Sequence, residues 1–171
     1  MYVFCFILLL ATSSAAQDKS AEWSTKRTIP RWARQEFKNH NLDRDYVITY
    51  QLYPSYFRGD FNDDGRRDVA ILVQNKNSGK SGIVIFHGKR PQAIYTQYFV
   101  LGAGKALGGA NADFKWVTSW SLIVERKATV IFGNRKLPTL HGDAIKMAQQ
   151  EEKTGLIYWD GKKYQWFDLK K

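Results

Sequence analysis

The residues best suited to chemistry form a short loop, rich in oxygen-bearing side chains, at positions 60–68. Its sequence is Asp-Phe-Asn-Asp-Asp-Gly-Arg-Arg-Asp, with oxygen side chains at loop positions 1, 3, 5 and 9 and glycine at position 6. Ca²⁺ takes about 6–8 oxygen ligands, and alternate residues of a tightly wound loop can direct their side chains to one centre. The spacing therefore predicts a Ca²⁺ site with the side-chain ligands Asp60, Asn62, Asp64 and Asp68, the last acting directly or through water.

Two further residues complete the expected geometry. Gly65 can adopt the backbone angles of a sharp reversal that a Cβ would hinder. The carbonyl of Arg66 can then point toward the ion while the arginine side chain points outward. The loop is not an EF-hand, because that motif ends with a bidentate Glu at position 12, where this chain has Ile71. An Asp/Asn/Gly-rich turn that holds no metal is the alternative.

The stretch from Gly59 to Ala70 resembles the calcium loop of FG-GAP and VCBS-type repeats, whose pattern is Gly-Asp-Phe-Asn-x-Asp-Gly-x-x-Asp-(Leu/Val)-Ala. The resemblance implies side-chain ligation by Asp60, Asn62, Asp64 and Asp68, a carbonyl ligand from Arg66, and an adhesion or recognition context in general. Those families usually repeat the motif to build a propeller, whereas this chain carries it once. A propeller is therefore not expected.

Composition places the chain among folded proteins with a basic surface. Its 171 residues are 44% apolar, with 6 Trp, 9 Tyr and 10 Phe, which suits one domain with a real core. The net charge of +10 favours anionic partners or serves only to keep the protein soluble. No dense block of Lys and Arg appears, which supports the second of these roles. The expected partner is an unknown protein or an anionic glycan, and nucleic acid is not expected.

The first residues predict export. Residues 1–16 carry no charged side chain, positions 3–11 are almost wholly apolar, and small residues precede Gln17, so a signal peptide cleaved after Ala16 is expected. The mature protein would be secreted or periplasmic, without a transmembrane segment, because the apolar run is too short to span a bilayer. The single cysteine, Cys5, lies in this leader, which excludes disulfides and thiol catalysis from the mature chain.

The remaining chain predicts an α+β fold, mostly antiparallel β-sheet in a meander and hairpins, with one N-terminal helix. Residues 17–27 are expected to be a flexible entry segment, and residues 28–171 a single β-rich domain. The helix should begin near Pro30, because proline suits the first helical position. The expected strands are 45–53, 69–74, 82–86, 93–101 and, around an Asp-Gly turn, 155–159 and 162–169.

The C-terminal hairpin is a possible ligand-contact surface. Trp159 and Trp166 lie beside Lys162 and Lys163, a combination suited to stacking on a sugar with anionic groups nearby. On a strand, Tyr164 and Trp166 share one face. The alternative is that these aromatic residues all pack in the core.

No catalytic motif emerges. The three histidines, His40, His87 and His141, have no zinc spacing and are expected at the surface or at caps. No Gly-x-Ser-x-Gly elbow occurs, and the question of enzymatic activity stays open, with the balance against it. The sequence thus predicts an exported, calcium-binding, non-catalytic binding or structural module. A secreted inhibitor or immunity-type protein is the first alternative, and a hydrolase of an anionic polymer is the second.

Overall fold

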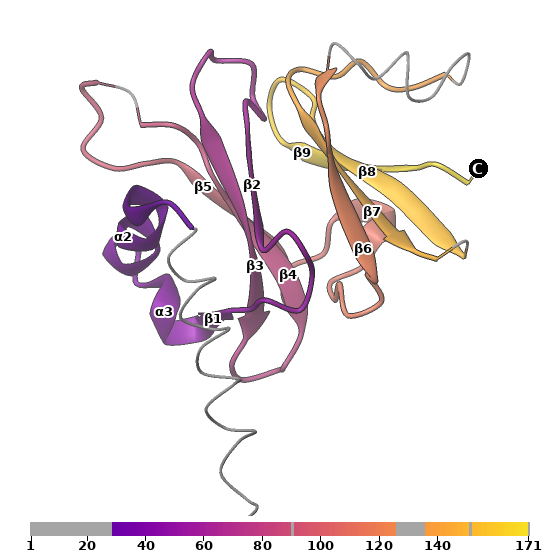
Figure 1. Cartoon of the computed structure of the whole chain (residues 1–171), viewed down its shortest axis with the longest axis horizontal. Helices are drawn as coiled ribbons and strands as arrows, with labels where there is room; N and C mark the ends of the chain where they lie inside the picture. Colours follow the sequence, from indigo (N-terminus) through magenta and orange to yellow (C-terminus); the bar gives the residue numbers. More distant parts are fainter. Residues whose placement is uncertain (1–28, 90, 126–135, 151, 171) are drawn as a thin grey trace, which may run out of the picture.

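The chain folds mainly into two antiparallel β-sheets (Figure 1). The computed structural model describes residues 29–89, 91–125, 136–150 and 152–170. The predicted signal peptide, 1–16, and entry segment, 17–27, lie outside the described residues. The expected mostly antiparallel β fold with an N-terminal helix is confirmed in outline.

Two short helices open the described chain. Helix α2 spans Arg31–Asn39, with Pro30 at its N-cap, and buries Ala33 and Phe37 against the sheet. Asn41 adopts a left-handed conformation with φ 54°, after which α3 spans Leu42–Asp45. No helix among the described residues is long and apolar enough to cross a membrane.

The first sheet, sheet A, is built around one long central strand. Its strands are β1 (Tyr46–Ile48), β2 (Tyr56–Gly59), β3 (Asp68–Asn75), β4 (Ser81–Phe86) and β5 (Tyr98–Gly102). Strands β3, β4 and β5 follow one another as predicted, although β5 begins at Tyr98 and not at residue 93. Strands β1 and β2 both pair with the same strand, β3. Sheet A is therefore not a simple meander.

The prediction of one continuous strand over residues 45–53 is wrong. Strand β1 ends at Ile48, and the chain bends through Pro54 before it returns to the sheet as β2. The eight residues of β3 leave room for two short strands in succession, β1 opposite its C-terminal end and β2 opposite its N-terminal end. Alternation of side chains cannot reveal such a break, because β1 and β2 lie in the same sheet.

The second sheet, sheet B, is sequential. Its strands are β6 (Ser119–Ile123), β7 (Ala144–Gln149), β8 (Lys153–Trp159) and β9 (Tyr164–Asp168), paired in chain order. The predicted C-terminal hairpin is confirmed, with Trp159 opposite Tyr164. In its turn, the carboxylate of Asp160 accepts the N–H groups of Lys162 and Lys163.

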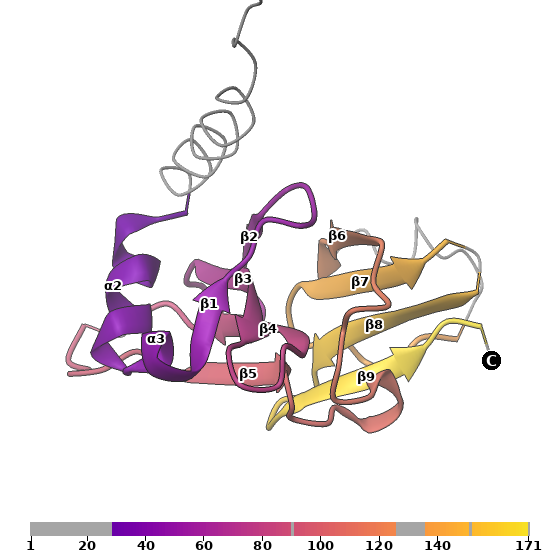
Figure 2. The ribbon, with the colours of Figure 1, turned by 90° about the horizontal axis from the view of Figure 1, so that it is seen from below.

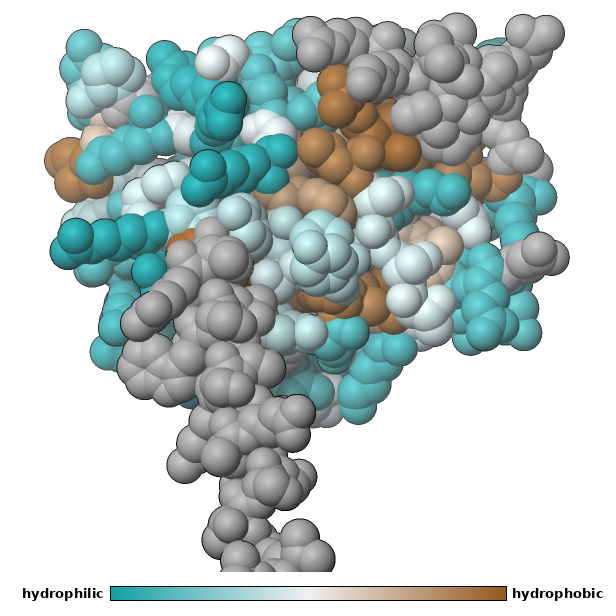
Figure 3. Space-filling view, in the orientation of Figure 1, coloured by the Kyte–Doolittle hydropathy of each residue, from teal (hydrophilic) through white to brown (hydrophobic). Residues whose placement is uncertain are grey.

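Sheet A lies between α2 and sheet B, so that both of its faces are covered (Figure 2). Along β3, Ile71 and Val73 face the helix, whereas Ala70 and Leu72 face sheet B. This two-sided burial explains the unbroken apolar run of β3 from Val69 to Val73. In the space-filling view, the side that carries α2 is largely hydrophilic and apolar residues gather between the sheets (Figure 3).

The predicted calcium loop connects β2 to β3 at one end of sheet A. Phe61, its second residue, is only 1% exposed and belongs to the core between the two sheets. Because this ring is enclosed, the start of the loop is held in place by the same packing that joins the sheets. The loop is thus an anchored connection close to the inter-sheet boundary.

Candidate functional site

Asp68 holds the two ends of the loop region together. Its carboxylate is fully buried and accepts the N–H of Phe61 at 2.8 Å and the N–H of Gly88 at 2.6 Å. Phe61 lies at the start of the loop, and Gly88 lies in the connection between β4 and β5. One buried carboxylate therefore joins three segments of the chain.

The electrostatic environment of Asp68 reflects a cluster of acidic groups. The pKa of Asp68 is raised to about 7, chiefly by burial and to a smaller extent by the charges of Asp64 and Asp60, whereas its two backbone N–H donors lower it. The three carboxylates are thus close enough to act on one another. A divalent cation placed among them would relieve this repulsion.

Asp60 is held from both sides. Its carboxylate oxygens accept the N–H groups of Asp64 at 3.0 Å and of Gly65 at 2.8 Å, which closes the loop on itself. Its own N–H donates to the carboxylate of Asp143 at 3.1 Å, and the Asp143 N–H donates to the Asp60 carbonyl at 2.7 Å. Sequence reasoning missed Asp143, because a partner 83 residues away leaves no local signal.

The structure of the turn agrees with the sequence-based prediction at Gly65 and differs from it at Arg66. Gly65 has a φ of +77°, which agrees with the sharp reversal expected at this glycine. The guanidinium of Arg66 does not simply extend into solvent. Its Nη1 lies 3.3 Å from Oδ2 of Asp64 and forms an ion pair, while the Arg66 N–H donates to Oδ1 of Asp64 at 3.0 Å. The guanidinium of Arg66 is therefore paired with Asp64, which is one of the predicted Ca²⁺ ligands.

Asn62 links the loop to sheet B through a histidine. Its side-chain nitrogen lies 3.1 Å from Nδ1 of His87, and Nε2 of His87 lies 2.7 Å from the hydroxyl of Tyr164. Burial, followed by the charges of Asp68 and Asp60, raises the pKa of Tyr164 well above its ordinary value, so the phenol stays protonated.

The expectation that His87 lies at the surface or at a cap is wrong. It is 3% exposed and packs among the rings of Phe99, Trp159 and Tyr164. The residue directly follows β4 and lies at the boundary with sheet B, a location that depends on how the sheets pack. The sequence signal available for it was only that it follows a fully apolar strand.

The donor set suits Ca²⁺ in kind, but its present arrangement is not a finished coordination shell. The side-chain oxygen of Asn62 is buried and has no hydrogen-bond partner among the described residues. Carboxylate oxygens that accept one N–H keep a further lone pair for a cation. However, the described part of the chain contains no group of three or more His, Cys, Asp or Glu side chains arranged to hold a metal ion. Ligation would therefore require Asp64 to separate from Arg66.

The residues of the possible hairpin contact do not form one exposed platform. Trp159 and Trp166 are half-buried and pack against the core between the sheets, on the same face as Tyr164, as the strand alternation predicts. The rings of Trp166 and Trp116 pack edge-on, with 5.8 Å between their centroids. Lys162 and Lys163 are exposed in the turn. This geometry favours packing as the main role of both tryptophans.

The link between His87 and Tyr164 yields a stability prediction. Replacing Tyr164 with Phe removes the hydroxyl that His87 bonds inside the protein, and should lower the free energy of unfolding by about 1–3 kcal/mol. Urea denaturation in the presence of EDTA measures this without a metal contribution. Tyr158→Phe is the matched control, because Tyr158 packs on the opposite face of sheet B. Equal losses in the two variants would show that the link contributes nothing specific.

Comparison of the chain with protein-family models, curated protein sequences and solved structures finds no match. The resemblance to FG-GAP and VCBS-type loops therefore rests on the residues from Gly59 to Ala70 alone. The function of this protein has to be argued from its own geometry and charge.

Proposed function

We propose that this protein is an exported, calcium-binding, non-catalytic binding or structural module. The observation that carries the proposal is the buried side-chain oxygen of Asn62, which lacks a partner among the described residues. It belongs to a loop in which burial, and after it the charges of Asp64 and Asp60, raise the pKa of Asp68. An orphaned oxygen beside mutually repelling carboxylates is what a hard divalent cation would satisfy.

In this proposal the ion would be ligated by the side chains of Asp60, Asn62, Asp64 and Asp68, with the carbonyl of Arg66. Its main role would be structural, because Asp68 is both a ligand and the first residue of the central strand β3. Fixing Asp68 fixes the entry of that strand into sheet A. The partner of the module would be a protein or an anionic glycan, in keeping with the net charge of +10.

Ca²⁺ binding is predicted to be of modest affinity, with a Kd on the order of 10⁻⁵ to 10⁻³ M. Asn62 contributes no charge, and Arg66 already pairs with Asp64, so the ion gains less than it would in an all-carboxylate loop. Isothermal titration calorimetry should show one site. Asp64→Ala should abolish it.

Asp63→Asn is the matched control for that experiment. Asp63 is exposed, has a φ of 56° that Asn also tolerates, and makes no side-chain hydrogen bond or ion pair within the described residues. The Asp63→Asn variant loses the same charge as Asp64→Ala and should bind Ca²⁺ nearly as well as the parent protein. Identical binding by the parent and the Asp64→Ala variant would refute the site.

Removal of the competing cation should strengthen binding. Arg66→Ala frees Oδ2 of Asp64 from its ion pair and is predicted to tighten Ca²⁺ binding by about threefold to tenfold at low salt. Arg67→Ala, which removes a charge from the exposed neighbouring residue, should have a smaller effect. Calorimetry at two salt concentrations tests both variants. Weaker binding by Arg66→Ala would mean that the guanidinium supports the site instead of competing for it.

A structural ion should stabilise the fold. A ligand that binds only the native state adds about 2.7 kcal/mol to the free energy of unfolding at 100 times its Kd. Excess Ca²⁺ should therefore raise the melting temperature, and EDTA should reverse the rise. If calorimetry detects binding while the melting temperature stays constant, the ion is not a structural staple.

A further inference from the structure

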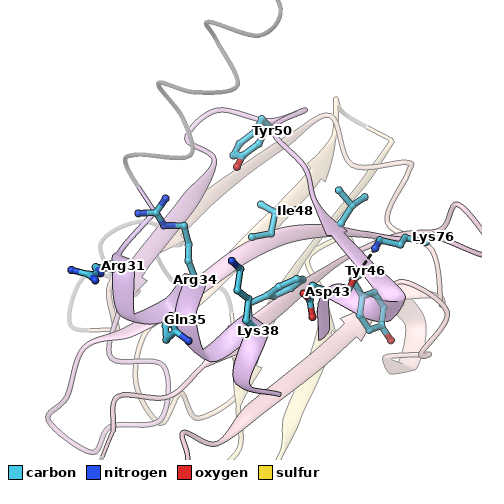
Figure 4. A pocket seen from close by; sticks show the side chains of 11 residues that line it. Arg31, Arg34, Gln35, Lys38, Asp43, Tyr46, Ile48, Tyr50 and Lys76 are labelled. Carbon is cyan, nitrogen blue, oxygen red and sulfur yellow. Dashed lines mark hydrogen bonds between the residues drawn. The ribbon is translucent and has the colours of Figure 1, made fainter. Parts of the chain in front are cut away.

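A groove separate from the calcium loop runs between helix α2 and strand β1. Its volume is about 560 Å³, within the range of about 300–1,000 Å³ typical of ligand sites. The helix contributes Arg31, Arg34 and Lys38 to its lining, and the strand contributes Tyr46 to Ile48 (Figure 4). The groove therefore combines a helical wall with the edge of a sheet.

The helical wall is strongly cationic. Arg31, Arg34 and Lys38 follow one another at i, i+3 and i+7, which places them along one side of α2. Figure 4 shows the charged end of Lys38 extending toward Ile48, and the side chain of Arg34 rising from the helix in the same upward direction. Nε of Arg34 is buried and has no hydrogen-bond partner among the described residues.

The positive charge of the groove is not neutralised within the described chain. Lys76 also lines the groove and donates to the carbonyl of Asp43 at 2.5 Å, and among the described residues Asp43 is the one acidic member of the lining. The ion pairs between described residues, His40 with Glu36 and Arg66 with Asp64, include no groove residue. Residues 17–28 carry three cationic and two acidic side chains, so this stretch has no excess of negative charge to offer.

The strand wall presents main-chain groups. The Asp45 carbonyl accepts the N–H of Lys76, and the Thr49 N–H donates to the carbonyl of Leu72, so alternate residues from 45 to 49 bond to β3. The main-chain groups of Tyr46 and Ile48 consequently face away from β3. The N–H of Tyr46 reaches the carbonyl of Leu42. Within the described residues, β1 pairs with no strand except β3, which leaves the Tyr46 carbonyl and both groups of Ile48 at an open edge.

We propose that the groove between α2 and β1 binds an acidic segment of a partner protein in an extended conformation. The segment would add to the edge of β1 by main-chain hydrogen bonds while its carboxylates pair with Arg34 and Lys38. Exposed Val47 and half-buried Ile48 offer apolar contact to the side chains between the acidic ones. The proposal is independent of calcium, because no residue of the loop lines this groove.

A peptide fits these features better than other polyanions. A glycan or a nucleic acid could use the cations, but neither supplies the alternating N–H and C=O groups that a sheet edge pairs with. The tyrosines of the groove are buried or half-buried, so they do not offer the exposed ring faces on which bases stack. The cations line one short groove and not a long stripe, which suits a ligand of a few acidic groups.

The test uses the full chain and a blocked, fluorescently labelled eight-residue peptide of alternating glutamate and valine. Fluorescence anisotropy should show saturable binding, equal in Ca²⁺ and in EDTA. The double variant Arg34→Glu, Lys38→Glu should weaken it by about tenfold or more. The double variant Lys105→Glu, Lys115→Glu makes the same change in net charge at exposed positions outside the groove and should change binding by less than about twofold. Circular dichroism confirms that each variant is folded.

Peptides N-methylated at alternate residues test the strand addition without altering the protein. Methylation of the set whose N–H groups face β1 should abolish binding, whereas methylation of the intervening set should leave it intact. Equal binding of both methylated peptides would overturn the proposal. A second outcome would also overturn it: the acidic peptide does not bind, whereas a sulfated oligosaccharide or single-stranded DNA does bind and loses this binding in the Arg34→Glu, Lys38→Glu variant. Failure of calcium binding in the same protein would leave this result unchanged and would refute only the calcium proposal.

Discussion

The buried carboxylate of Asp68 is the constraint on which this end of the molecule depends. It is fully enclosed, and its two backbone donors, from Phe61 and Gly88, tie the loop and the connection between β4 and β5 to the first residue of β3. Burial of a carboxylate is unfavourable, and the pKa near 7 records that cost. The fold tolerates it because the same group organises three segments at once.

The two sheets meet at the same place. Phe61 enters the core between them, and the chain of contacts from Asn62 through His87 to Tyr164 crosses from the loop to sheet B. The loop is thus coupled to the packing of the whole molecule. An ion bound in the loop would affect the packing of the two sheets as well as the loop itself. A site of modest affinity could therefore still contribute to stability.

Local patterns in the sequence predicted the local features. The apolar run of β3, the Asp160-Gly161 hairpin, the shared face of Tyr164 and Trp166 and the left-handed Gly65 all depend on neighbours in the chain. The misses were long-range. The burial of His87 depends on how the two sheets pack, and the Asp143 carboxylate that accepts the Asp60 N–H lies 83 residues away. The split of one expected strand into β1 and β2 depends on the length of β3. The groove along α2 arises only when the helix packs on sheet A.

The central claim is that the loop holds Ca²⁺ once Arg66 releases Asp64. A crystal structure determined in excess Ca²⁺ tests it most directly. We expect one ion about 2.3–2.6 Å from oxygens of Asp60, Asn62, Asp64 and the Arg66 carbonyl, with Asp68 bound directly or through water. The guanidinium of Arg66 should have moved away from the carboxylate of Asp64. A structure at saturating Ca²⁺ that keeps the Arg66–Asp64 ion pair and shows no ion in the loop would refute the proposed calcium site.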